Sequence, residues 1–127
     1  AVLWAATDGP DTDFMAKLVV VKRDGRAINL VDGVLRTRFR NGFDREDFVE
    51  AGRVYRYEID LWATSYRLEA GERLRVDVTS SNFPRLARNL NTGAPFAKTS
   101  AMRTARQAVH VARDRPSHVV LPVIPLR

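Results

Sequence analysis

The chain has 127 residues, of which 45% are apolar and 28% are charged. This length corresponds to about one domain with a single core, and the composition is that of a globular protein rather than a disordered or fibrous one. The net charge is +6, and the absence of cysteine excludes disulfides, thiolate nucleophiles and zinc sites of the cysteine type.

Four strands are expected in the first third of the chain, beginning with residues 1–7. The dipeptides Asp24–Gly25 and Asp32–Gly33 predict turns, because glycine accepts a positive φ and aspartate bonds the neighbouring backbone. These turns separate strands predicted at residues 14–22, 26–31 and 34–40.

Alternation of apolar and polar residues marks two strands in the middle of the chain. In residues 54–61 the inward face would consist of Tyr55, Tyr57, Ile59 and Leu61. In residues 74–79 it would consist of Leu74, Val76 and Val78. Two further strands are predicted at residues 107–112 and 117–123, and residues 99–107 are expected to form a loop or one helical turn.

About eight short strands with turn signals between them predict an all-β sandwich rather than βαβ units. Residues 1–127 would form one such domain. Because the chain opens inside a strand, the sandwich could lack its first strand or strands, which would leave an edge or a core face exposed.

The chain carries six distinctive stretches: residues 11–19 (DTDFMAKLV), 24–27 (DGRA), 32–36 (DGVLR), 55–62 (YRYEIDLW), 80–93 (SSNFPRLARNLNTG) and 115–123 (RPSHVVLPV). In this order and spacing they resemble the C-terminal domain of the X-Pro dipeptidyl-peptidase and cocaine-esterase-like serine hydrolases. The resemblance implies a jelly-roll sandwich of the galactose-binding-domain-like type. In that family the sandwich follows an α/β-hydrolase domain of the same polypeptide, which is therefore the implied partner.

The sequence shows no serine hydrolase site of its own. Such a site needs a nucleophile on a sharp turn, commonly Gly-x-Ser-x-Gly, and this motif is absent. The resemblance places the catalytic triad in the hydrolase domain, so we expect no catalytic residue and no cofactor here. His110, Asp114 and His118 are equally spaced, but Pro116 interrupts any helix that would align them, and a turn between two strands is expected.

Three carboxylates, Asp8, Asp11 and Asp13, could hold a cation such as calcium. The intervening Gly9–Pro10 favours the alternative, a turn in which the aspartates bond backbone amides. We favour the turn and expect no metal.

The polar face of residues 34–40 carries Arg36, Arg38 and Arg40, which could neutralise phosphates while tyrosines stack on bases. Nearby acidic residues could instead pair with these arginines: Asp44, Glu46, Asp47, Glu58 and Asp60. The tyrosines also fall at positions expected to face the core. We therefore expect no nucleic acid partner, and no apolar run is long enough to predict a membrane partner.

Exposed aromatic planes beside polar groups are typical of sugar sites, which makes Trp4, Trp62 and Tyr66 candidates for a carbohydrate site. Because both tryptophans lie on or at the end of a predicted strand, we favour core packing for them.

The loop at residues 80–93 is long, polar and specific in sequence. Its amides, forked guanidinium donors and rigid Phe83–Pro84 step suit docking onto a partner surface. A self-contained loop whose asparagines satisfy their own backbone is the equal alternative. The candidate interdomain interface consists of Asn82, Phe83, Pro84, Arg85, Arg88, Asn89 and Asn91.

The functional hypothesis is therefore a non-catalytic C-terminal accessory domain of a serine acyl hydrolase. The resemblance covers X-Pro dipeptidyl-peptidases, α-amino-acid ester hydrolases and related esterases or acylases. The domain would pack on the catalytic domain and could shape the substrate pocket or support a homo-oligomer. The alternative is a free-standing carbohydrate-binding module. The absence of cysteine and of a secretory signal favours the cytoplasm, although a targeting segment upstream of Ala1 would not be seen.

Overall fold

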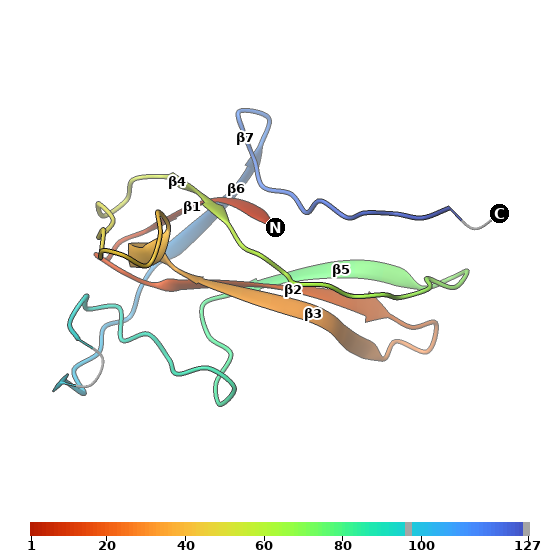
Figure 1. Ribbon diagram of the computed structural model, residues 1–127, viewed down its shortest axis with the longest axis horizontal. Helices are drawn as coiled ribbons and strands as arrows, with labels where there is room; N and C mark the ends of the chain where they lie inside the picture. The colour runs from red at the N-terminus through yellow and green to blue at the C-terminus, as the bar shows by residue number, and fades with distance from the viewer. Residues whose placement is uncertain (96–97, 126–127) are drawn as a thin grey trace.

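Two antiparallel sheets form the computed structural model, which describes residues 1–95 and 98–125 (Figure 1). One sheet has the order β4 (Tyr55–Glu58), β1 (Val2–Thr7), β6 (Gln107–Ala112), β7 (Arg115–Pro116). The other has the order β3 (Ala27–Arg36), β2 (Asp13–Val21), β5 (Arg73–Thr79). A 3-10 turn, η1 (Thr37–Phe39), follows β3, and the described ranges contain no α-helix. The predicted all-β class is confirmed, and no helix in these ranges is long and apolar enough to cross a membrane.

The core lies between the two sheets and is built by alternate residues of their strands. Leu3 and Ala5 of β1 pack with Phe14 and Ala16 of β2. Tyr57 of β4 joins them, and its ring centroid lies 5.1 Å from that of Phe14. Alternation places these residues on the inner faces because successive side chains of a strand point to opposite sides.

The turn predicted at Asp32–Gly33 is wrong, because both residues lie inside the continuous strand β3. Gly33 pairs with Ala16 of β2. A Cβ atom at Gly33 would lie 1.9 Å from the carbonyl oxygen of Asp60. Glycine is therefore needed here for the close approach of another backbone segment and not for a turn.

The strand predicted at residues 34–40 ends early. β3 stops at Arg36, and η1 carries Thr37 and Arg38 inward, where both are buried. The side chain of Arg38 meets the buried carboxylate of Asp11. This ion pair accounts for an inward arginine on what the sequence predicts as a polar strand face.

The last predicted strand, residues 117–123, is also wrong. β7 is limited to Arg115–Pro116, and one further bridge joins His118 to Val2. After that bridge the chain runs away from the four-stranded sheet as an extended tail, with no ladder partner in the described part of the chain (Figure 1).

Leu74, Val76 and Val78 do lie on the inner face of β5, because they pair with buried residues of β2. All three nevertheless remain exposed. The face was predicted correctly, whereas its burial was not.

Candidate functional site

His110, Asp114 and His118 lie around the turn that joins β6 and β7. The hydroxyl of Ser117 donates a hydrogen bond of 2.6 Å to the carbonyl oxygen of His110. Nδ1 of His118 lies 2.7 Å from the carbonyl oxygen of Pro116. In both contacts the acceptor or neighbouring atom is a backbone carbonyl oxygen. The three residues therefore belong to a turn between two strands, as predicted from the sequence.

The three aspartates considered for a cation are all hydrogen-bonded or ion-paired to protein groups. Oδ1 of Asp8 accepts the backbone N–H of Arg106 at 3.0 Å. Asp11 and Asp13 are buried and face arginines of β3 and η1. In the described ranges no three acidic or histidine side chains are grouped so as to hold a metal ion. The predicted local turn is also not what satisfies Asp11, because its partners lie far along the chain.

A buried polar cluster forms where the chain enters β2 and leaves β3. We call it the aspartate hub, and its members are Asp11, Asp13, Arg36, Arg38 and Asn89. Asp11, 0% exposed, accepts hydrogen bonds from the backbone N–H and the Nε of Arg38 at 3.0 and 2.9 Å. Arg36 binds both oxygens of Asp13, and this contact raises the pKa of the Arg36 guanidinium above its ordinary value. Each buried charge thus meets an opposite one, as buried charges require.

The arginines considered for nucleic acid are all paired with acids. Besides its contact with Asp11, Arg38 binds Glu46 at 2.9 Å, and Arg40 binds Asp47 at 2.7 Å. Glu46 and Asp47 belong to the acidic set predicted for this role. All three arginines of this face therefore form ion pairs with acidic residues of the same chain.

The C-terminal half of the loop at residues 80–93 turns into the protein. Nδ2 of Asn89 donates to Asp11 and to Asp13, both at 2.8 Å, and its Oδ1 accepts the backbone N–H of Asn91. The amide of Asn91 accepts the hydroxyl of Thr12 at 2.9 Å. Asn89 and Asn91, two of the predicted interface residues, thus anchor the loop to the sandwich. Only the bond between Asn91 N–H and Asn89 lies within the loop, so these asparagines do not form the self-contained loop of the alternative.

The N-terminal half of the loop crosses the outer face of the three-stranded sheet and is exposed at its tip. Asn82 accepts a hydrogen bond of 2.7 Å from Lys17 of β2. Phe83, 74% exposed, precedes Pro84 through a cis peptide bond. Arg88 is also exposed, and its guanidinium contacts the sulfur of Met102 at 3.2 Å.

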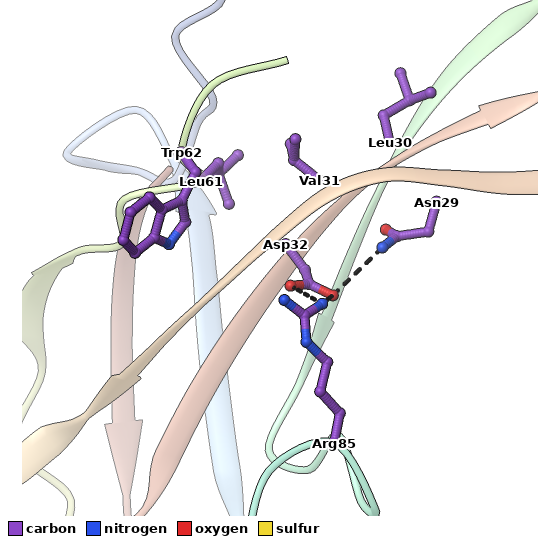
Figure 2. A pocket seen from close by; sticks show the side chains of 7 residues that line it. All are labelled: Asn29, Leu30, Val31, Asp32, Leu61, Trp62 and Arg85. Carbon is purple, nitrogen blue, oxygen red and sulfur yellow. Dashed lines mark hydrogen bonds and ion pairs between the residues drawn. The ribbon is translucent and has the colours of Figure 1, made fainter.

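Arg85 reaches from this loop to the free edge of β3. Its guanidinium binds the carboxylate of Asp32 at 2.5 Å, and the same carboxylate accepts amide N–H groups of Asn29 and Asn82. Figure 2 shows Asn29, Asp32 and Arg85 of this cluster together with the indole of Trp62, which line a hollow of about 210 Å³. The hollow combines an apolar plane with an ion pair and amides.

Trp62 was expected in the core and is instead 83% exposed. The φ of 64° at Trp62 departs from a strand conformation, and its backbone N–H donates to Oδ1 of Asp60 at 2.7 Å. The alternation could have predicted this exposure: if residues 55, 57, 59 and 61 face inward, residue 62 faces outward. Trp4 is partly buried on β1, and Tyr66, also expected inward, is exposed and hydrogen-bonded to Lys22 and Glu72.

Comparisons with known proteins agree with one another. The family described as the X-Pro dipeptidyl-peptidase C-terminal non-catalytic domain matches residues 1–120. Cocaine esterase of Rhodococcus sp. (strain MB1 Bresler) is 45% identical over 126 residues, which are 98% of this chain and 22% of that protein. The chain therefore spans about a fifth of the length of this relative.

Two solved structures share the fold. An aminopeptidase from a marine sediment Thaumarchaeota archaeon superposes with a TM-score of 0.85 at 31% identity, and an α-amino acid ester hydrolase does so with 0.81 at 27% identity. Each match covers 91% of this chain and 21% of the other.

Proposed function

Because this chain belongs to the family of X-Pro dipeptidyl-peptidase C-terminal non-catalytic domains, we propose that it is the accessory domain of a serine acyl hydrolase. It supplies no nucleophile. Its role is to pack against an α/β-hydrolase catalytic domain of the same polypeptide and to hold the entrance of the substrate pocket or an oligomer contact. The two sheets are accordingly part of a galactose-binding-like jelly roll to which further strands belong.

The observation that carries this proposal is the exposed surface at the β3 edge. Trp62 and Phe83 are large aromatic side chains that the described part of the chain leaves uncovered; Arg85, from the same loop as Phe83, lines the hollow beside Trp62. Tryptophan and arginine are enriched among the residues that dominate binding energy at protein interfaces. We name Trp62, Phe83, Pro84, Arg85 and Arg88 the docking surface.

The first test is to determine the coding sequence upstream of Ala1. We expect it to encode a Gly-x-Ser-x-Gly elbow a few hundred residues earlier, as an α/β-hydrolase domain requires. The complete polypeptide should then react stoichiometrically with a fluorophosphonate probe at that serine. A probe-labelled site inside residues 1–127 would contradict the accessory role.

The docking surface is tested in the complete polypeptide by Trp62→Ser and Phe83→Ser. Each should separate the unfolding of the two domains in calorimetry, since truncating a central interface aromatic costs about 2 kcal/mol or more. Phe43→Ser is the matched control, because Phe43 is equally exposed but lies on a different loop. Equal effects of Phe43→Ser and Trp62→Ser would refute this surface.

The hollow beside Trp62 supports a second candidate function, a carbohydrate site. An indole plane next to a carboxylate, a guanidinium and two amides offers both stacking and hydrogen bonds to a sugar ring. Titration of a glycan panel should then quench tryptophan fluorescence saturably, and Trp62→Phe should reduce this. A flat response would leave docking as the role of the surface.

A further inference from the structure

Asn41–Gly42 is the only asparagine–glycine step in the sequence, and it follows directly on η1. The side chain of Asn41 is exposed. Gly42 has a φ of 128°, which glycine adopts readily because it has no Cβ atom. A Cβ atom there would lie 2.9 Å from Oδ1 of Asp44. The position therefore requires glycine, and no side chain of residue 42 shields the backbone nitrogen that follows Asn41.

This step holds a nucleophile next to an electrophile. The covalent chain keeps the backbone nitrogen of Gly42 within reach of Cγ of Asn41, so that closure of a five-membered ring is intramolecular. The nitrogen loses its proton and bonds to Cγ, the bond from Cγ to Nδ2 breaks, and ammonia leaves with the proton. Water then opens the cyclic imide and leaves aspartate or isoaspartate at position 41. The reaction consumes water, releases ammonia and needs no other reactant.

Two hydrogen bonds hold this step in the conformation before reaction. Nδ2 of Asn41 donates to Oδ2 of Asp47 at 2.6 Å, and the backbone N–H of Gly42 donates to the carbonyl oxygen of Phe39 at 3.1 Å. The bond from Asn41 to Asp47 is exposed to solvent. Exposed hydrogen bonds open by local fluctuation without unfolding of the domain. The attack of the Gly42 nitrogen therefore needs only a local opening of this turn.

The partner of Asn41 also fixes the following loop to the aspartate hub. Oδ2 of Asp47 accepts a hydrogen bond of 2.7 Å from Arg40, and the backbone N–H of Asp47 donates to the carbonyl oxygen of Arg38 at 2.8 Å. Arg38 in turn binds the buried carboxylate of Asp11. Deamidation would replace the N–H donor to Asp47 with a carboxylate, and two like charges at this distance repel each other. Isoaspartate would also lengthen the backbone by a methylene group.

We infer that Asn41–Gly42 is a site of spontaneous deamidation, and that the new carboxylate releases the loop at residues 41–49 from the aspartate hub. Because the ammonia is diluted away, each molecule passes through this change once and in one direction. The remaining asparagines precede residues whose side chains hinder the attacking nitrogen, and Asn89 is buried as well. They are Asn29, Asn82, Asn89 and Asn91.

The site is tested in the complete polypeptide by incubation in heavy-oxygen water, followed by digestion in ordinary water. The peptide that contains Asn41 should gain a heavy oxygen at least about tenfold faster than the peptide that contains the exposed Asn29, since only Asn41 precedes a residue without Cβ. The rate should rise with pH, because the attacking nitrogen must lose its proton. Asn41→Gln is the matched control: it keeps the amide but would need a six-membered ring, so it should stay unlabelled. Labelling at Asn41 no faster than at Asn29 would overturn the site.

Release of the loop is measured by hydrogen exchange in the same polypeptide. Useful reporters are the amides of Asp47 and Val49, which donate to the carbonyl oxygens of Arg38 and Pro10. Asn41→Asp carries the charge of the product, and both amides should exchange about tenfold faster in it than in Asn41→Gln. Added salt should narrow this difference, because it screens like charges at the surface. Unchanged exchange in β2 would show that the domain stays folded, and equal exchange of the two variants at low salt would overturn the release.

Discussion

Asn89 is predicted to fix the long loop to the sandwich, and Asn89→Ala tests this. The amide of Asn89 donates two hydrogen bonds of 2.8 Å, one to Asp11 and one to Asp13, and accepts one from the N–H of Asn91. It is 6% exposed, so water does not readily replace it. The substitution removes all three bonds and leaves both carboxylates in place.

The magnitude follows from the remaining partners of the carboxylates. A hydrogen bond to a charged group contributes about 1.5–3 kcal/mol to stability. Because Asp11 keeps Arg38 and Asp13 keeps Arg36, neither charge is left unpaired, and the lower end of the range applies to each bond. The free energy of unfolding should therefore fall by about 3 kcal/mol, a large share of the 5–15 kcal/mol of a typical domain.

Urea unfolding followed by circular dichroism measures the loss, and hydrogen exchange of the amides at residues 86–93 measures the release of the loop. Arg45→Ala is the control, because its side chain is exposed on another loop, outside both the aspartate hub and the docking surface; it should change stability by less than about 0.5 kcal/mol. A cost of Asn89→Ala below about 1 kcal/mol, with unchanged exchange in the loop, would refute the anchoring role.

Three further substitutions test separate parts of the fold. Gly33→Ala should cost about 3 kcal/mol or more in urea unfolding, since its Cβ would lie 1.9 Å from the carbonyl oxygen of Asp60; a cost below about 1 kcal/mol would be inconsistent with that approach. Tyr57→Phe should leave stability unchanged or raise it by about 1 kcal/mol, because the buried Tyr57 hydroxyl has no hydrogen-bond partner among the described residues and burial raises its pKa; a clear loss would indicate a hidden partner. The hydrogen bond from Lys22 lowers the pKa of Glu72 to about 2, from its ordinary 4.5. Ionised Glu72 therefore stabilises the fold at pH values above 4.5, and this stabilisation is lost as the pH falls toward about 2. The urea midpoint of Glu72→Gln should be lower than that of the natural chain near neutral pH and should converge with it at about pH 2, and a constant difference would contradict the assignment.

Strands were predictable where the signal is local. Alternation in residues 54–61 located β4, because the side chains of a strand with one covered face alternate between apolar and polar. The turn dipeptide Asp24–Gly25 marked the end of β2 to within a few residues. The same alternation identified the inner face of β5, since Val76 pairs with Leu18 as that face requires.

Tertiary contacts decided the positions that the sequence predicted wrongly. Asp32–Gly33 has the composition of a turn, but both residues pair with β2 within β3, and the glycine makes room for the carbonyl oxygen of Asp60. Arg38 lies on an apparent polar face, and only its partner Asp11, far away in the sequence, explains its burial. Neither contact can be predicted from the local amino-acid composition, because the two residues of each contact lie far apart in the sequence.

The loop at residues 80–93 combines a fixed base with an uncovered tip, and this arrangement bears on how it would dock. Asn89 ties the base to the aspartate hub, while Asn82 and Arg85 bind Lys17 and Asp32 on either side of Phe83. A side chain held between two fixed neighbours loses less conformational freedom on binding than one on a free loop. The buried charges of the aspartate hub contribute little as an isolated source of stability, since apolar packing could replace them. Their value lies in holding a polar loop in one conformation, so that an exposed aromatic tip meets its partner already positioned.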